Sequence, residues 1–114
     1  MKLLTEAIRN KMINNYSRSS EEGEPIDHKP VVKLFTPDGN ATWLLTELEA
    51  ETNLAFGLCD LGMGYPELGY VSIDELMTVR GQLGLPVERD RSFEADKTLS
   101  EYSKEARLKE RIYA

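Results

Sequence analysis

The segment from Asp60 to Glu67 is the part of this chain whose residue types suggest ligand binding. It holds two glycines, a tyrosine and a carboxylate at each end. Backbone N–H groups of glycine-rich loops can cradle phosphate. A phosphate loop, however, requires Gly-Lys-Ser/Thr at the start of a helix, and a dinucleotide fingerprint requires glycines at a strand-to-helix turn. This loop has no lysine and lies between two expected strands, so its pattern does not favour nucleotide binding.

Two arginines, Arg80 and Arg89, follow this loop and could approach it to form a site for an anion. The alternating charges around Arg89 are also typical of surface ion pairs, each of which contributes about 0–1 kcal/mol, and we favour that structural explanation. The candidate ligand- or partner-binding residues are Asp60, Tyr65, Glu67, Arg80 and Arg89. No catalytic residue is predicted.

The chain has one histidine and one cysteine. His28 lies in the polar segment Ser17–Pro30, which we expect to be a solvated loop, and Cys59 lies in an apolar, strand-like run. Cys–His chemistry and metal coordination both require these groups to converge with others. Nothing in their spacing brings them together, so neither a metal site nor a cofactor is predicted.

Size and charge narrow the classes of function. The 114 residues suit one domain, and the net charge of −6 opposes nonspecific binding to phosphate backbones. A single cysteine excludes a disulfide within the chain. The first apolar run is too short for a signal peptide, and no stretch approaches the roughly 20 apolar residues that span a bilayer. We therefore expect a cytoplasmic protein that contacts no membrane, and the negative charge disfavours binding to nucleic acid.

Hydrophobic periodicity and turn residues predict the elements that would position the candidate side chains. Ser72 with Glu75, and Thr98 with Glu101, form capping boxes at two helix starts. The capping box and the helix start also explain the neighbouring carboxylates of Asp74 and Glu75. The N-terminal helix is expected at 6–14, with Thr5 as its cap. It is followed by a loop at 17–30, strands at 31–36, 41–48, 54–59 and 68–71, a helix at 73–80 closed by Gly81, an extended segment ending at Phe93, and a helix at 99–111.

Adjacent strands with turn signals between them favour antiparallel pairing. The predicted fold class is α+β, with an antiparallel sheet of four to five strands flanked by N-terminal, middle and C-terminal helices. On the second strand, Trp43 and Leu45 are expected on one face and Leu44 on the other. The residues before this strand, Pro37–Asn40, are predicted to form a turn. Asp38 is expected to hydrogen-bond within that turn.

The C-terminal helix presents two apolar strips. We assign residues 1–96 to a single domain and residues 97–114 to a helical extension. Leu99, Tyr102 and Ala106 share one face of this helix. Leu108 and Ile112 point roughly the opposite way. One strip is expected to dock on the domain and the other to meet a partner; a frayed tail is the alternative.

Several sequence segments are typical of one protein family. They are MKLLT, KLFTPDGNATWLLTE, FGLCDLGMGYPELGYVSIDEL and RGQLGLPVERDRSFE, in that order, and they extend to about Glu94. The chain resembles the bacterial family called "domain of unknown function 2958". The resemblance implies a small bacterial protein associated with plasmids, conjugative elements and phages. It implies no activity and no ligand residues.

Three functions are compatible with these observations. The first is a non-enzymatic interaction protein of a mobile element or phage, which binds a protein partner such as a replication, transfer or host-defence component. The second is a small-ligand or nucleotide binder or hydrolase that uses the loop 60–67 and the nearby arginines. The third is nucleic-acid binding through the basic C-terminal helix. Small size, an acidic surface and the absence of a convergent catalytic set favour the first.

Overall fold

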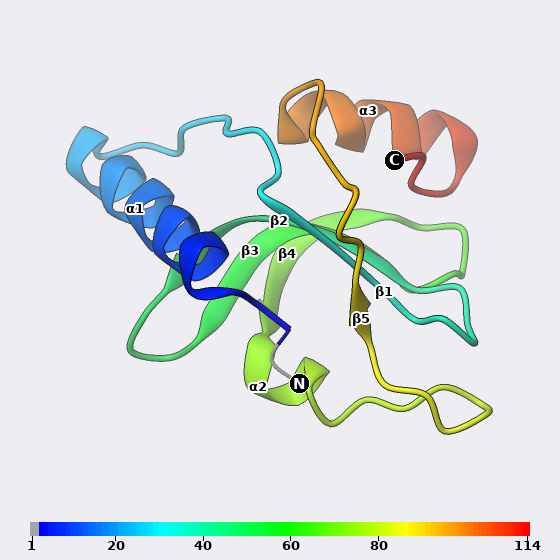
Figure 1. The fold of residues 1–114 in the computed structure, drawn as a ribbon. Helices are drawn as coiled ribbons and strands as arrows, with labels where there is room; N and C mark the ends of the chain where they lie inside the picture. The colour runs from blue at the N-terminus through cyan, green and yellow to red at the C-terminus, as the bar shows by residue number, and fades with distance from the viewer. Residues whose placement is uncertain (1–2) are drawn as a thin grey trace.

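The structure, a computed structural model, describes residues 3–114. These residues fold into one antiparallel sheet and three helices (Figure 1). Met1 and Lys2, which begin the first segment of the family resemblance, lie outside the described residues. The elements are α1 (Glu6–Glu22), β1 (Val32–Phe35), β2 (Thr42–Glu49), β3 (Leu54–Asp60), β4 (Glu67–Ser72), α2 (Ile73–Leu76), β5 (Glu88–Arg89) and α3 (Leu99–Lys109). The strand order is β4-β3-β2-β1-β5. The predicted α+β class is confirmed.

The central strand β2 is buried on both of its faces. Trp43 and Leu45 belong to an apolar cluster with residues of α1, α2 and the N-terminal segment. Leu44 belongs to a second cluster, with Leu58 of β3 and the buried residues of α3. The predicted division of these side chains between two faces is therefore confirmed. Helices α1 and α2 cover one face of the sheet and α3 covers the other (Figure 1).

A bulge changes the alternation in the second half of β2. The register with β3 shifts between Leu45 and Glu47, so that Thr46 is the extra residue. The Thr46 hydroxyl donates to the carbonyl of Phe56 at 3.3 Å. Because of this shift, Leu48 returns to the first cluster, on the same face as Leu45.

Helix α1 is longer than predicted. It begins with the expected cap, Thr5, whose hydroxyl accepts from Ile8 N at 3.1 Å, but it continues to Glu22 and ends at Gly23 in a left-handed conformation. The prediction of a loop at 17–30 was therefore wrong for residues 17–22, which are helical. The helix continues because two polar residues on its inner face, Asn15 and Ser19, are buried.

Helix α2 is shorter than predicted. It ends at Leu76 with Met77 as a right-handed cap, so Gly81 does not close it. Gly81 instead lies against the first hairpin: a Cβ added at Gly81 would stand 1.6 Å from Asp38 Oδ1. The predicted helix at 73–80 was thus right about its start, where Ser72 accepts from Glu75 N, and wrong about its end.

Asp38 fastens a distant loop. Its Oδ2 accepts from Leu83 N at 2.7 Å and from Leu85 N at 3.3 Å. The turn that contains Asp38 is held by Thr36, whose carbonyl accepts from Gly39 N and whose hydroxyl accepts from Ala41 N. The expectation that Asp38 bonds within its own turn was wrong.

Both ends of α3 are attached to the rest of the fold. At its start, Leu99 N donates to His28 O at 2.9 Å and Ser100 N donates to Asp27 Oδ1 at 3.0 Å. Although burial favours the neutral acid, hydrogen bonds from Ser100 outweigh it and lower the pKa of Asp27. After the helix, Ile112 N donates to Asp60 Oδ2 at 3.0 Å.

Within residues 3–114, no helix is both long and apolar enough to cross a membrane.

The paired glycines Gly57 and Gly69 give the sheet a direct test. A Cβ at Gly57 would stand 2.0 Å from the backbone oxygen of Leu44, whereas a Cβ at Gly69 would meet nothing within 4 Å. Gly57→Ala should lower the free energy of unfolding by about 3 kcal/mol or more, because backbone atoms must move. Gly69→Ala should change it by no more than about 0.5 kcal/mol. Urea unfolding of both variants measures this; equal losses would contradict the observed packing.

Candidate functional site

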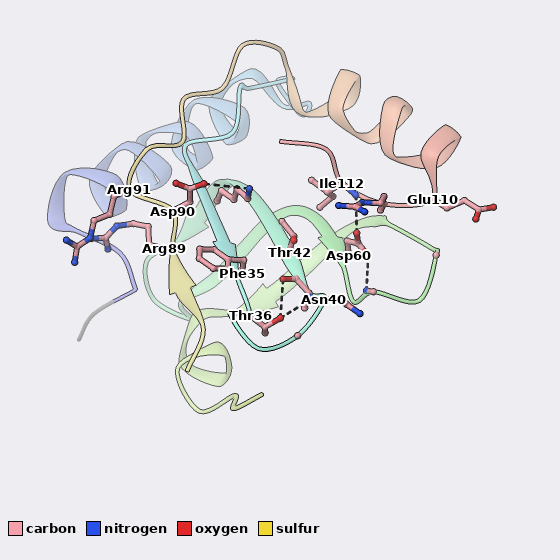
Figure 2. A pocket seen from close by; sticks show the side chains of 16 residues that line it. Phe35, Thr36, Asn40, Thr42, Asp60, Arg89, Asp90, Arg91, Glu110 and Ile112 are labelled. Atoms are coloured by element: carbon pink, nitrogen blue, oxygen red, sulfur yellow. Dashed lines mark hydrogen bonds and ion pairs between the residues drawn. The ribbon is translucent and has the colours of Figure 1, made fainter. Parts of the chain in front are cut away.

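The five predicted site residues do not form one site. Asp60 and Arg89 line a cavity of about 780 Å³ beside the sheet, together with Gly62 and Gly64 of the loop 60–67, which we call the tip loop (Figure 2). Tyr65 and Glu67 are exposed and do not line it. Arg80 is also exposed, and its guanidinium donates to the carbonyls of Met77 and Val79. The structure thus brings two of the five candidates to one cavity.

The Asp60 carboxylate is occupied by the chain's own backbone. The residue is buried, its Oδ1 accepts from Gly62 N at 2.8 Å, and its Oδ2 accepts from Ile112 N at 3.0 Å. These two bonds connect the end of β3 to the tip loop and to the segment that follows α3. Figure 2 shows both bonds at the wall of the cavity. The geometry therefore gives Asp60 a structural role.

The cations of the cavity also serve internal contacts. Arg89 donates to the carbonyl of Leu3 at 2.7 Å, beside the start of α1. Lys33 pairs with Asp90 at 3.6 Å and donates to the Ala114 carbonyl at 2.7 Å. In Figure 2, Arg89 and Arg91 project toward α1, on the opposite side of the view from Asp60. The cavity accordingly has polar walls, and Arg89, Lys33 and Asp90 of these walls already serve contacts within the chain.

A buried polar cluster connects α1 to β2, and the sequence did not reveal it. Ser19 Oγ lies 3.3 Å from both His28 Nε2 and Glu47 Oε2, and His28 Nε2 also lies 3.2 Å from Asn15 O. His28 is half-buried, which differs from the solvated position expected for it. A carbonyl oxygen only accepts, so the proton belongs on Nε2 and this nitrogen cannot take one from Ser19. The cluster is therefore not a Ser–His–acid catalytic arrangement.

The cysteine has no catalytic partner in this cluster. Cys59 lies on β3 and packs against the first apolar cluster. Burial raises the pKa of its thiol, which opposes formation of the reactive thiolate. Across the described chain, residues 3–114, no group of three or more His, Cys, Asp and Glu residues is placed to hold a metal ion.

The edge strand β4 forms the other feature that could bind a partner. Leu68 and Tyr70 of β4 point to the face covered by α3, because they pair with Leu58 and Phe56 of the second cluster. Leu68 is 40% exposed and Tyr70 is 71% exposed, although the Tyr70 ring packs on Phe56 with centroids 5.2 Å apart. Two large apolar side chains are thus presented to solvent beside a strand edge that has no further neighbour among residues 3–114.

Helix α3 forms the second wall of this feature. A groove of about 480 Å³ lies between β4 and α3 and is lined by Leu68, Ser100, Ser103, Lys104, Arg107 and Leu108. We call this groove, together with Tyr70, the edge groove. Leu108 is 81% exposed. Ile112, predicted on the same strip as Leu108, is instead buried in the second cluster because the chain turns at Glu110, which has a left-handed conformation.

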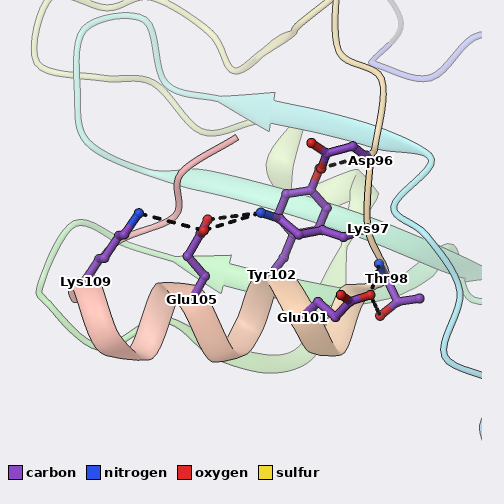
Figure 3. Close-up of polar contacts among 7 residues, drawn as sticks. All are labelled: Asp96, Lys97, Thr98, Glu101, Tyr102, Glu105 and Lys109. Carbon is purple, nitrogen blue, oxygen red and sulfur yellow. Dashed lines mark hydrogen bonds and ion pairs between the residues drawn. The ribbon is translucent and has the colours of Figure 1, made fainter.

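Two cations of the edge groove have no acidic partner in the described part of the chain. The side chains of Lys104 and Arg107 form no ion pair or hydrogen bond with other residues in 3–114. Figure 3 shows where the nearby acidic groups are used: Glu105 contacts Lys97 and Lys109, and Glu101 caps the start of α3 at Thr98. The positive charge at the groove is therefore available to a ligand.

Removal of one acceptor from Asp60 tests its structural role. In Asp60→Asn the side chain keeps one oxygen and turns an amide N–H₂ toward the other backbone donor. We expect a loss of about 1–3 kcal/mol in the free energy of unfolding. Glu67→Gln, at an exposed position, is the control and should be neutral. An Asp60→Asn variant as stable as the wild type would contradict the proposed role.

The buried carboxylate of Glu47 predicts a pH dependence. Burial raises the pKa of Glu47, while His28 and Ser19 oppose the rise. A raised pKa in the folded state gives a stability contribution that is complete below the unfolded pKa, about 4.3, and is lost as the pH rises through the folded value. Glu47→Gln should therefore gain melting temperature relative to the wild type as the pH increases from 4 to 8. Thermal unfolding across this range measures the difference, with Glu21→Gln at an exposed position as the control. If both variants show the same dependence on pH, the raised pKa of Glu47 is refuted.

Comparison with known families gives one match. A family model described as "Protein of unknown function (DUF2958)" matches residues 3–113. The match includes α3, which lies beyond the segments that carry the resemblance seen in the sequence. No curated protein and no solved structure matches the chain.

Proposed function

The chain belongs to the DUF2958 family of proteins of unknown function, and we propose from its own surface that it is a non-enzymatic interaction protein that binds a protein partner. The edge groove is the proposed contact surface. The observation that carries this proposal is the combination of exposed Leu68, Tyr70 and Leu108 with a free strand edge. Apolar side chains gathered on a polar surface are typical of protein contacts.

The contrast with the polar cavity supports this choice. In the cavity, Asp60 and Lys33 are already bonded to the chain, and Arg89 donates to Leu3 O. In the edge groove, the side chains of Lys104 and Arg107 lack such partners among the described residues, and Leu108 is exposed to solvent. A protein contact would bury that apolar area and use the two charges.

A small-ligand or nucleotide binder or hydrolase is the second candidate. The cavity of about 780 Å³, with Asp60 and Arg89 in its wall, favours it. In this candidate the ligand would meet wall groups, such as Asp60 and Lys33, that already bond within the chain, and the edge groove is left without a use. We therefore rank it second. Nucleic-acid binding through α3 ranks third, because the net charge is −6 and one of its lysines, Lys109, is paired with Glu105.

The biological setting is part of the proposal. The family resemblance supports a bacterial protein of a plasmid, conjugative element or phage, whose partner is a replication, transfer or host-defence component. The single cysteine and the absence of a long apolar run support a cytoplasmic location without membrane contact.

Site-specific photocrosslinking tests the proposed contact surface. A benzoylphenylalanine placed at Tyr70 or at Leu108 should give an adduct with the same cellular protein. The same probe at Leu83, which is 80% exposed in a different loop, is the control and should not. The cells are those that naturally encode the chain, with the protein at its natural level. Failure of both groove positions to give an adduct would refute the proposed function.

A further inference from the structure

We infer that the edge groove binds its partner as an added β-strand, which is an extended acidic segment of another protein. The backbone of this segment would pair with β4. Its apolar side chains would cover Leu68 and Tyr70, and a carboxylate would pair with Lys104 or Arg107. The inference rests on the proposed function and adds to it the mode of binding and the chemistry of the partner.

The backbone of β4 is suited to accept a strand. Its six residues pair with β3 from Glu67↔Cys59 to Ser72↔Leu54 without a register shift. On its other side, the structure of residues 3–114 gives β4 no strand neighbour. In an antiparallel ladder, alternate residues point their N–H and C=O groups away from the paired strand. β4 therefore presents a regular row of backbone donors and acceptors.

This edge lacks the devices that usually prevent strand addition. Proteins protect edges with very short strands, bulges, prolines or inward-pointing charges, above all lysine. β5, at the opposite edge, has two residues and is followed by Asp90 and Arg91. β4 has neither lysine nor proline nor a bulge, and its only charged residue is Glu67 at its first position. The difference indicates that the β4 edge is kept open for pairing.

The side chains beside this edge define what an added strand would present. Leu68 and Tyr70 are two residues apart and share the face on which α3 stands. An added strand would place every second side chain over this face, between β4 and the α3 wall that contains Ser103 and Leu108. Apolar side chains at those positions would fill the groove.

The charges define the chemistry of the segment. Lys104 and Arg107 line the groove from α3 and lack acidic partners within the described residues. Both positions are exposed in a chain whose net charge is −6. A carboxylate on the groove-facing side of the added strand would meet both cations, whereas a basic segment would be repelled.

A second copy of this chain fits the groove less well. Antiparallel pairing of β4 with itself requires a two-fold axis perpendicular to the sheet. Such an axis would place both α3 helices on the same face, with the groove-lining Lys104 and Arg107 of each copy turned toward those of the other. Like charges would then face one another across the axis. The charge arrangement therefore favours a different, acidic chain.

Peptide selection tests the inference. A display library of random peptides of about ten residues is selected on the wild-type protein after depletion on Tyr70→Lys, whose side chain charges the edge. Enriched peptides should alternate apolar residues, contain carboxylates and lack proline. Thermal unfolding checks that Tyr70→Lys remains folded, as expected for a residue that is 71% exposed. Absence of enrichment, or enrichment of basic peptides, would overturn the inference.

Two matched sets of variants test the mode of binding. The double variant Lys104→Glu/Arg107→Glu should bind the selected peptide about tenfold more weakly, or worse. The control variant Lys11→Glu/Arg18→Glu changes the net charge by the same amount at exposed positions on α1, and it should bind the peptide as the wild type does. Two versions of the peptide, N-methylated at alternate residues in the two possible registers, should differ sharply, because only one set of N–H groups faces β4. Equal binding of both versions would overturn strand addition.

The outcomes separate the two proposals. A crosslinked adduct at Tyr70 and Leu108, without selection of acidic strand-forming peptides, would overturn the strand inference and leave the protein-binding function intact. Absence of any adduct would overturn the function itself. A concentration-dependent dimer that Tyr70→Lys abolishes, measured by sedimentation, would identify a second copy as the occupant and would also overturn the inference.

Discussion

Burial of β2 on both faces is the constraint on which the rest of the fold depends. Trp43 and Leu45 require cover on one side of the sheet, and Leu44 requires cover on the other. A single layer of helices could not supply both. Helix α1 and the short α2 therefore pack on one side and α3 packs on the other, although α1 and α3 lie at opposite ends of the chain (Figure 1).

The same constraint determines where function can lie. The helices that cover the central strands leave the two outer strands, β4 and β5, at the margins of the sheet. β5 is short and charged, and the wall of the adjacent cavity contains internal hydrogen bonds such as that from Ile112 N to Asp60. β4 is regular and apolar, and it stands next to α3. The two margins thus differ in chemistry, and the difference follows from a few residues on each outer strand.

Local rules predicted most of the elements from the sequence. Caps at Thr5 and Ser72 and the turn signals between strands were sufficient for the helix starts and the hairpins. The errors have a common physical cause, which is contact between distant segments. Ser19 is polar yet buried because it meets Glu47, and Asp38 leaves its own turn because it meets Leu83 N. Periodicity and propensity contain no information about such pairs.

The candidate site was predicted less completely for the same reason. Asp60 was recognised as a notable carboxylate, but its backbone partner Ile112 N lies in a segment that the sequence could not place. The edge groove depends on the position of α3 and on the strand order, which gives β4 one strand neighbour in the described part of the chain. Leu68 and Leu108 were visible in the sequence only as members of separate elements.

The attachment of α3 at both ends has a further consequence for recognition. His28 O and Asp27 hold its first turn, and Asp60 holds the segment after it. One wall of the edge groove is therefore preorganised, and its ordering cost is met during folding. Binding of the proposed extended segment would then cost little conformational entropy on the protein side, and its affinity would be limited mainly by the disorder of that segment.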